Sequence, residues 1–253
     1  MARYKITVEY DGSPFFGWQR QNGMDTIQQC LEEAILPLTK IPTTLYGAGR
    51  TDTGVHANGQ VAHFDSARDL DCFRIQECMN AHLKDAPIAV LSVKKVSELF
   101  DARFSALERT YVYKILNRRA KACLDVLRVW NVIPYVDEEK MDAAAQYLVG
   151  KHDFSAFRAA GCQSNSPVKT LNRIFVRREG DIVKIQTSAR SFLYRQVRNI
   201  VGSLVFVGCG KWSERDFQEV FHAKDRRKAA PTAPAHGLYF VNVTYPPNSM
   251  QEA

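Results

Sequence analysis

The stretch RYKITVEYDG, residues 3–12, alternates apolar and polar side chains up to its last two residues. Alternation of this kind is typical of a strand with one face in a hydrophobic core. The Asp11-Gly12 pair is typical of a turn, which would end the strand at Tyr10. The buried face would carry two aromatic and two aliphatic side chains, from Tyr4, Ile6, Val8 and Tyr10. The chain therefore opens with one strand of a sheet, and its partners must come from similar patterns further along.

Two helices and three more strands follow in the first half of the chain. Helical spacing of apolar residues predicts a helix over Thr26–Thr39. Asp71 is placed to cap a second helix, which carries Ile75 and Met79 on one face. Extended patterns predict three strands, at residues 44–46, 60–64 and 88–96. The resulting order, β-α-β-β-α-β, is that of the ferredoxin-like unit.

The second half of the chain nearly repeats this order. Its predicted elements are strands at 109–116 and 128–133, a helix at 137–149, a hairpin at 170–188, helices from Ser191 and at 216–221, and a strand at 237–245. We therefore predict an α+β fold of two tandem ferredoxin-like units with a central, mainly antiparallel sheet. The N-terminal unit would span residues 1–105, and the C-terminal unit, with its extra helix, residues 106–253.

The charge of the chain is common among nucleic-acid binders but is weak evidence by itself. The 253 residues carry a formal net charge of +7, and the pI is about 9.1. Many of the cations fall into three clusters: Arg103, Arg109, Lys114, Arg118, Arg119 and Lys121; Arg190, Arg195 and Arg198; and Lys224, Arg226, Arg227 and Lys228. Solvated protein faces would explain such clusters equally well.

Other totals bear on the compartment. No apolar run reaches the ~18 residues that a membrane span needs, and the N-terminal segment lacks the apolar stretch of a signal peptide. The six cysteines are scattered without a CxxC pair, which indicates free thiols and no zinc site. We therefore expect a cytoplasmic protein that has no membrane partner and no metal.

The glycine-rich stretch GAGRTDTGVHA, residues 47–57, lies between the second and third predicted strands, in the kind of loop where function concentrates. Gly49 and Gly54 have the spacing of a phosphate-binding loop, but the Lys and Ser/Thr that should follow are absent. Asp52 stands where a dinucleotide fingerprint needs its third glycine. The histidines of this region and the HDFS stretch at 152–155 do not have the spacing of a metal site or a catalytic triad.

A single carboxylate, Asp52, remains as a candidate for chemistry in this loop. It follows Arg50 by two residues, so the two side chains point the same way in an extended segment. A neighbouring guanidinium favours the ionised carboxylate, which could then act as a nucleophile or general base. The residues alone also allow an aspartate that hydrogen-bonds its own backbone in a glycine-rich turn.

The stretch GRTDTGVHA resembles the signature of the TruA family of tRNA pseudouridine synthases, with Thr53 where the usual form has alanine. Five further blocks resemble the family in the same order: YDGSPFFGWQRQ, FDARFSALERTYVYKI, GKHDFSAF, FLYRQVRNIVGSL and APAHGLYFVNVTY. Together the blocks span nearly the whole chain. The resemblance implies the pseudouridine synthase fold, formed by the two ferredoxin-like units.

The reaction that the resemblance implies is an isomerisation of uridine within tRNA. The base is detached from its ribose at N1, turned, and rejoined through C5, without cofactor, metal or energy source. The family acts in the anticodon stem and loop, at uridines of the 3′ half (tRNA positions 38–40).

The resemblance also assigns roles to residues of this chain. Asp52 corresponds to the catalytic aspartate, which attacks either C6 of the uracil or C1′ of the ribose. Tyr111 corresponds to the tyrosine that stacks on the target base, and Arg198 to the basic residue that pairs with the aspartate. Arg50 would bind the backbone of the flipped nucleotide. Taken alone, Tyr111 would equally suit a sheet face, and Arg198 the solvated side of a helix.

Partners follow from the same resemblance. Family members are homodimers in which one tRNA lies across both subunits. Four residues are candidates for tRNA contacts: Arg20, Arg103, Gln163 and Ser164. Structured RNA is held mainly through phosphates and shape, so we expect affinity to fall as salt rises.

Three alternatives stay open. A non-catalytic tandem ferredoxin-like RNA-binding protein would explain the charge, but the aromatic RNP pattern is absent and Asp52 would have no role. A methyltransferase would need a glycine-rich cofactor turn, which YDGSPFFG does not supply. A pseudouridine synthase that acts on another RNA site fits the sequence as well as the anticodon assignment does.

Overall fold

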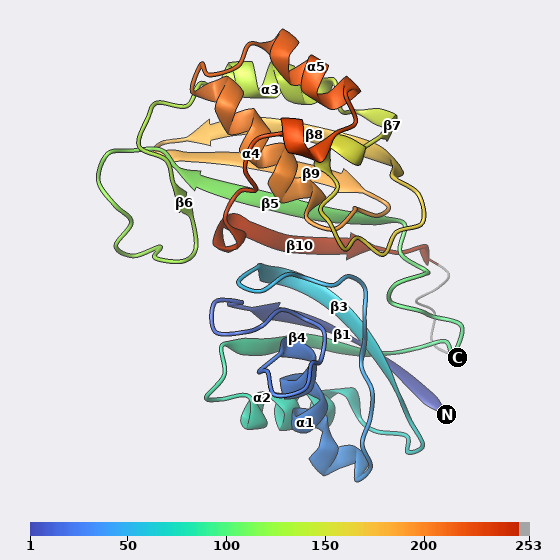
Figure 1. Ribbon diagram of the computed structural model, residues 1–253. Helices are drawn as coiled ribbons and strands as arrows, with labels where there is room; N and C mark the ends of the chain where they lie inside the picture. Colours follow the sequence, from blue (N-terminus) through green and yellow to red (C-terminus); the bar gives the residue numbers. More distant parts are fainter. Residues whose placement is uncertain (248–253) are drawn as a thin grey trace. The chain divides into compact units, whose positions relative to one another are not determined.

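The computed structural model describes residues 1–247 and shows a mixed α+β fold with mainly antiparallel strand pairing (Figure 1). The chain divides into two compact units, Met1–Arg109 together with the segment from Phe240 onward, and Thr110–Tyr239. The α+β class predicted from the sequence is confirmed. In the described part of the chain, no helix is both long and apolar enough to cross a membrane.

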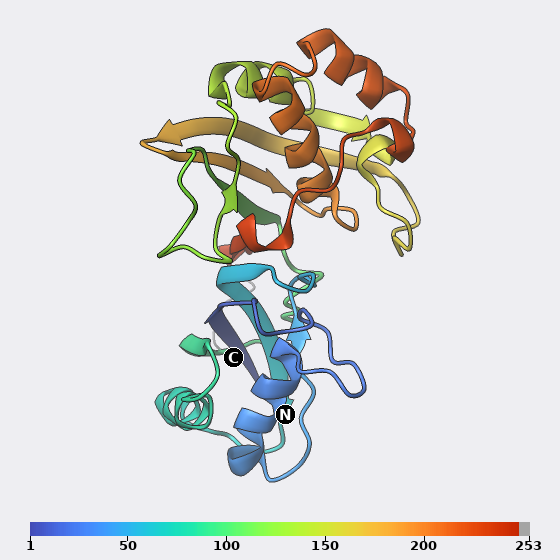
Figure 2. The same ribbon diagram turned by 60° about the vertical axis from the view of Figure 1, so that its left-hand side comes forward.

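The first unit has the predicted order of elements. These are β1 (Ala2–Tyr10), α1 (Ile27–Thr39), β2 (Tyr46–Gly47), β3 (His56–Ser66), α2 (Cys72–His82) and β4 (Ile88–Val96). β1 lies between β3 and β4 and is antiparallel to both, while β2 pairs with β3. Residues Phe240–Thr244 of β10 (Leu238–Thr244) belong to this unit, in which β10 follows β3 in the strand order. Figure 2 shows α1 and α2 beside this sheet.

The alternation of the opening strand places its side chains as predicted. Tyr4, Ile6 and Val8 are fully buried and Tyr10 is nearly so. Thr26 caps α1 through its hydroxyl, which accepts from the Gln29 backbone N–H, and the Asp71 carboxylate caps α2 in the same way. Local side-chain bonds of this kind satisfy amides that a helix leaves unpaired, so both helices begin where the sequence indicated.

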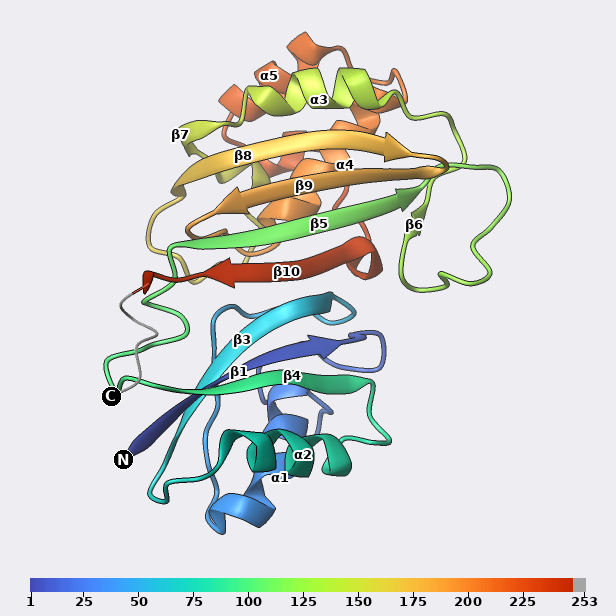
Figure 3. The ribbon, with the colours of Figure 1, turned by 180° about the vertical axis from the view of Figure 1, so that it is seen from behind.

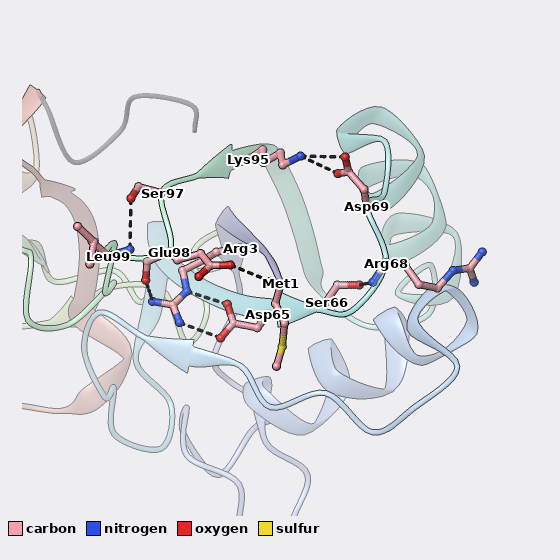
Figure 4. A network of polar contacts seen from close by, with 10 residues as sticks. All are labelled: Met1, Arg3, Asp65, Ser66, Arg68, Asp69, Lys95, Ser97, Glu98 and Leu99. Atoms are coloured by element: carbon pink, nitrogen blue, oxygen red, sulfur yellow. Dashed lines mark hydrogen bonds and ion pairs between the residues drawn. The ribbon is translucent and has the colours of Figure 1, made fainter.

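Figure 4 shows a network of polar contacts at the end of this sheet where β1 begins and β3 and β4 end. The Arg3 guanidinium binds both carboxylate oxygens of Asp65 on β3, at 2.7 and 2.8 Å, and the carbonyls of Glu98 and Phe100. The hydrogen bond from Arg3 is the main cause of a lowered pKa at Asp65. Nearby, the Lys95 ammonium binds the Asp69 carboxylate. Arg3, at the start of β1, therefore holds β3 through its bidentate contact with Asp65. Its bonds to the two carbonyls also hold the segment after β4.

The second unit has strands and helices of its own, seen from behind in Figure 3. Its elements are β5 (Glu108–Leu116), β6 (Trp130–Asn131), α3 (Glu138–Gln146), β7 (Gly150–Asp153), β8 (Val168–Glu179), β9 (Ile182–Ala189), α4 (Gln196–Gly208) and α5 (Glu214–His222), with 3-10 turns at Ser155–Phe157, Arg226–Lys228 and Ala235–Gly237. The strand order is β5-β9-β8-β7. The predicted hairpin is β8 and β9, with Gly180 at φ +60° in the turn.

The helix predicted at 137–149 ends at Gln146, and β7 was not predicted. Two further predicted boundaries in this unit are wrong for reasons that the structure shows. Ser191 does not open a helix, because α4 begins at Gln196 after Arg195 adopts a left-handed backbone at φ +57°. The Gln196 side chain accepts from the backbone N–H of Leu193 and holds the preceding residues as a loop. The strand predicted at 128–133 is reduced to Trp130–Asn131. The Asn117 amide bonds the carbonyls of Val132 and Pro134, so these groups join a side chain instead of a strand ladder.

Candidate active site

The stretch predicted as the catalytic loop joins β2 to β3, and its last two residues are already part of β3. Arg50 is exposed, Asp52 is half-buried, and Thr51 between them is buried. The Val55 backbone N–H donates to the Asp52 carbonyl at 3.1 Å, which closes a turn directly after the carboxylate. The loop therefore displays Arg50 and Asp52 at the surface and keeps Thr51 inside.

The entrance to this loop is fixed at Ala48. Its backbone N–H donates to the Val61 carbonyl at 2.7 Å, and its carbonyl accepts from Nε and Nη2 of Arg109, at 2.9 and 2.8 Å. The Arg109 guanidinium also binds the carbonyl of Arg103 at 2.6 Å, and only 7% of the residue is exposed. The sequence placed Arg109 in a basic cluster suited to solvent or RNA. The structure instead buries it as a brace for the loop.

A buried chain of hydrogen bonds lies beneath the loop. The Tyr10 hydroxyl and the Thr51 hydroxyl are 2.8 Å apart, and Tyr10 also hydrogen-bonds the Gln60 side chain. The Gln60 amide donates to the Gly49 carbonyl at 2.9 Å. Burial raises the pKa of Tyr10 to about 12, so its phenol stays neutral at physiological pH. Side-chain hydrogen bonds from Gln60 and Tyr10 thereby hold Gly49 and Thr51, the residues on either side of Arg50.

The segment after β1, residues 11–18, packs closely against the loop. A Cβ at Gly12 would come within 2.0 Å of the Val55 carbonyl oxygen, and one at Gly17, whose φ is +86°, within 2.6 Å of the Thr51 carbonyl oxygen. The Trp18 backbone N–H donates to that same Thr51 carbonyl at 3.0 Å. Glycine is therefore required at both positions, since the two backbones approach too closely for a side chain.

The histidine that ends the loop has a structural role. The Nδ1 atom of His56 accepts from the Gly12 backbone N–H at 3.1 Å, and only 2% of the residue is exposed. His63, further along β3, accepts in the same way from the Ala102 backbone N–H. Both bonds join residues far apart in the sequence, and neither histidine had the spacing of a metal site. Together with the contacts of Gly12 and Gly17, the His56 bond holds the loop against the segment after β1.

The second unit places the predicted base-stacking tyrosine on β5. Tyr111 is half-buried, and its ring meets the ring of Phe192 edge-on, with centroids 5.2 Å apart. Phe192 belongs to the loop before α4, the element that carries Arg198 in its first turn. An aromatic pair with one partly exposed ring can present a face to a flat base. Phe192 was not singled out in the sequence, although it opens the FLYRQVRNIVGSL block.

Arg198 is half-buried and held by the segment before β10. Its Nε donates to the carbonyl of Ala233 at 2.9 Å, and the hydroxyl of Tyr113 donates to the neighbouring carbonyl of Pro234 at 2.7 Å. Burial raises the pKa of Tyr113, and the positive charge of Arg198 opposes that shift in part. One backbone segment thus fixes the direction of both side chains.

The four residues predicted to contact RNA differ in their surroundings. Arg20 forms an ion pair with Glu32 at 2.8 Å, and Arg103 is exposed and stacks on Phe104. Gln163 is exposed, whereas the Ser164 hydroxyl donates to the Ser166 carbonyl and accepts from Lys169. Arg20 and Arg103 belong to the first unit, and Gln163 and Ser164 to the second.

The third predicted basic cluster is largely engaged inside the second unit. Arg226 binds the carbonyls of Ala229 and Ala230 as well as the side chains of Asn199 and Thr232. Arg227 is paired with Asp225, and Lys224 with Asp153 at 3.4 Å. Only part of this cluster is therefore suited to bind phosphate.

Several site residues escaped sequence reasoning. Tyr10 and Gln60 looked like strand residues, and Trp18 like part of an aromatic loop. Their partners in the predicted catalytic loop are separated from them by 41 residues for Tyr10 and 11 for Gln60, so no local period reveals them. The available signal was that Tyr10 and Trp18 fall within YDGSPFFGWQRQ, one of the six blocks.

An α+β fold with an oriented carboxylate on a braced loop, in a basic chain, suits an enzyme that acts on RNA. A profile of the tRNA pseudouridine synthase family matches residues 6–105 and 144–246. Proteins named tRNA pseudouridine synthase A are similar along their whole length. The one from Maricaulis maris is 53% identical over 97% of this chain and 99% of its own, and the one from Rhodospirillum centenum is 53% identical over 97% and 100%.

The similarity extends to other bacteria, since the protein of the same name from Bradyrhizobium sp. is 50% identical over 97% of this chain and 100% of its own. This chain belongs to the tRNA pseudouridine synthase family. It is accordingly an isomerase that converts uridine to pseudouridine in tRNA, as the resemblance implied.

Proposed function

We propose that the protein isomerises uridines in the anticodon stem and loop of tRNA, with Asp52 as the catalytic carboxylate. The observation that carries this proposal is the bracing of residues 48–56. Buried bonds from Arg109, Tyr10 and Trp18 fix the backbone around a carboxylate that is itself only half-buried. Braces of this kind around one half-buried carboxylate are what preorganised catalysis needs. The position within tRNA comes from the resemblance to the TruA family.

The chemistry needs no outside reactant. The bond between N1 and C1′ breaks, a bond between C5 and C1′ forms, the C5 proton leaves, and N1 takes up a proton, so the composition of the nucleotide is unchanged. Asp52 would attack either C6 of the uracil or C1′ of the ribose and leave again when the new bond is made. A braced carboxylate suits either route, because both need one oxygen at a fixed distance from the nucleotide.

Two residues of the second unit would complete the reaction. By the resemblance, Tyr111 would stack on the flipped base and help to remove the C5 proton, and Arg198 corresponds to the basic residue that pairs with the catalytic aspartate. The ring contact of Tyr111 with Phe192 and the bond from Arg198 to Ala233 support these roles, because each limits the motion of the side chain. Flipping a base costs a few kcal/mol, which stacking on an aromatic face offsets.

The remaining proposals concern partners. Arg50, which is exposed beside Asp52, would hold the backbone of the flipped nucleotide, and Arg20, Arg103, Gln163 and Ser164 would contact the rest of the tRNA. The net charge of +7 supports binding through phosphates. A cytoplasmic homodimer without cofactor follows from the resemblance. A monomer in light scattering at working concentration would contradict the dimer.

The anticodon assignment is tested by release of tritium from C5 of labelled uridine in tRNA transcripts. Wild-type protein is expected to release tritium from a transcript with uridines in the 3′ half of the anticodon arm. A matched transcript with those uridines replaced, and base pairing restored, should release none. Release from the second transcript at the same rate would move the target to another site in the tRNA.

Arg198→Ala is expected to lower the rate of pseudouridine formation by about 10- to 100-fold without weakening tRNA binding, because the carboxylate loses its charge partner. Single-turnover rates and filter binding measure the two effects separately. Arg215→Ala is the matched control, since Arg215 is an exposed arginine of α5 that pairs only locally with Glu219. If Arg198→Ala weakens binding and leaves the rate unchanged, the pairing with Asp52 is wrong.

A further inference from the structure

Two aromatic hydroxyls on β1 have different partners, although they lie on the same face of the same strand. The Tyr4 hydroxyl accepts from the Leu70 backbone N–H at 2.6 Å and lies near Asp69, in the segment before α2. The Tyr10 hydroxyl bonds Thr51, the residue directly before Asp52, at 2.8 Å. Tyr10 is 3% exposed and Thr51 is 7% exposed, so this second bond is shielded from water.

The bond from Tyr10 decides which way the loop presents its side chains. Successive side chains of an extended segment point to opposite sides, so an inward Thr51 makes its neighbours Arg50 and Asp52 point outward. A one-residue slip would reverse this and bury the two charges. The Thr51 hydroxyl would cost free energy in the interior without a partner, and Tyr10 supplies that partner.

The backbone of Thr51 is held as well as its side chain. Its carbonyl accepts from the Trp18 backbone N–H at 3.0 Å and lies against Gly17. The Gly49 carbonyl, two residues earlier, accepts from Gln60, which also bonds Tyr10. Tyr10 therefore joins two fixed points of the loop, one on each side of Arg50, and both lie next to the groups proposed to bind and attack the nucleotide.

We propose that Tyr10 is a positioning residue for the isomerisation, and that it acts by holding Thr51 so that the Asp52 carboxylate faces the nucleotide. This inference rests on the proposed catalytic role of Asp52. The ring of Tyr10 packs near the ring of Trp18, with centroids 6.3 Å apart. Phenylalanine would keep this ring contact, so packing alone does not require the hydroxyl. The hydroxyl is what links β1 to the loop.

The test compares single-turnover rates of pseudouridine formation at saturating tRNA. Tyr10→Phe and Thr51→Val, which is nearly isosteric, remove the same hydrogen bond from its two ends. Each is expected to lower the rate by about 10- to 100-fold, the effect of a misplacement of about 1 Å, with tRNA affinity unchanged. The double variant should be no slower than either single variant, because one interaction is lost in all three. Thr51→Ser keeps the hydroxyl and should keep most of the rate.

Tyr4→Phe is the matched control. It removes a buried hydroxyl from the same face of β1 and is expected to lower the melting temperature to a similar extent, with the wild-type rate retained. A wild-type rate for Tyr10→Phe overturns the proposal, and so does an equal loss of rate in Tyr4→Phe. If Thr51→Val does not fold, Tyr10→Phe and Thr51→Ser still decide the matter. Asp52→Asn, measured in parallel, separates the two claims: turnover in that variant refutes the role of Asp52 itself, whatever the rate of Tyr10→Phe.

Discussion

Asp52→Asn is expected to bind tRNA with near-normal affinity and to form no pseudouridine, a loss of at least about 10⁴-fold in single-turnover rate. The substitution keeps the shape of the side chain and removes the charge needed for attack on the nucleotide. The loop should keep its conformation, because the turn after residue 52 uses the Asp52 backbone carbonyl and the braces act on Ala48, Gly49 and Thr51. Tritium release from labelled uridine measures the rate, and filter binding measures the affinity.

Asp65→Asn is the matched control for this loss. Asp65 is also a partly exposed aspartate of the first unit, but its carboxylate binds Arg3 at the other end of β3. Removing that charge should lower stability a little and leave turnover intact. Turnover by Asp52→Asn would show that the carboxylate is not the attacking group. Loss of tRNA affinity in Asp52→Asn would show that the charge serves binding, and the proposed mechanism would then need another group.

The elements that were predicted correctly are those whose determinants are local. The alternation of residues 3–10 indicates β1, and the caps at Thr26 and Asp71 mark the starts of α1 and α2. The turn at Gly180 marks the β8–β9 hairpin. In each case, the residues that set the backbone lie within a few positions of the element itself, so one sequence carries enough information.

The errors have a different origin. The start of α4 depends on a left-handed arginine, Arg195, a conformation that composition does not favour. The shortened β6 depends on Asn117, an amide 13 residues before Trp130 that takes carbonyls which a strand ladder would otherwise use. Such side-chain to backbone bonds across a loop have no period, and pattern reasoning therefore extends the strand too far.

The same distinction divides the candidate site. The sequence indicated Asp52 and Arg50 directly, and resemblance supplied Tyr111 and Arg198. The sequence did not indicate which residues brace the loop, because Tyr10 is 41 residues from Thr51 and Arg109 is 61 residues from Ala48. Arg109 was even placed with surface cations, since charge along a strand says nothing about which backbone carbonyls will face it. The carboxylate proposed to react was thus readable from the sequence, and the residues that brace its loop were not.

Arg109→Met is expected to lower the free energy of unfolding by about 2–4 kcal/mol, because it leaves the buried carbonyl of Ala48 without its donors and also removes the donor to the Arg103 carbonyl. Methionine keeps much of the apolar stem, so the loss reports on the guanidinium rather than on packing. Urea unfolding measures the stability, and the single-turnover rate measures the consequence for the loop. Because Ala48 is the entrance to the segment that carries Asp52, the rate should fall even at temperatures where the variant is fully folded.

Arg215→Met distinguishes this brace from arginines in general. Arg215 is exposed and pairs with Glu219 four residues on, an interaction worth only about 0.3–0.5 kcal/mol in a helix. Its loss should change neither stability nor rate by a measurable amount. If Arg109→Met behaves like Arg215→Met, the loop does not depend on the buried guanidinium. If Arg109→Met loses stability but keeps its rate, Arg109 supports the fold alone. The direction of Asp52 must then be set by the contacts of the loop with Tyr10, Gln60 and Trp18.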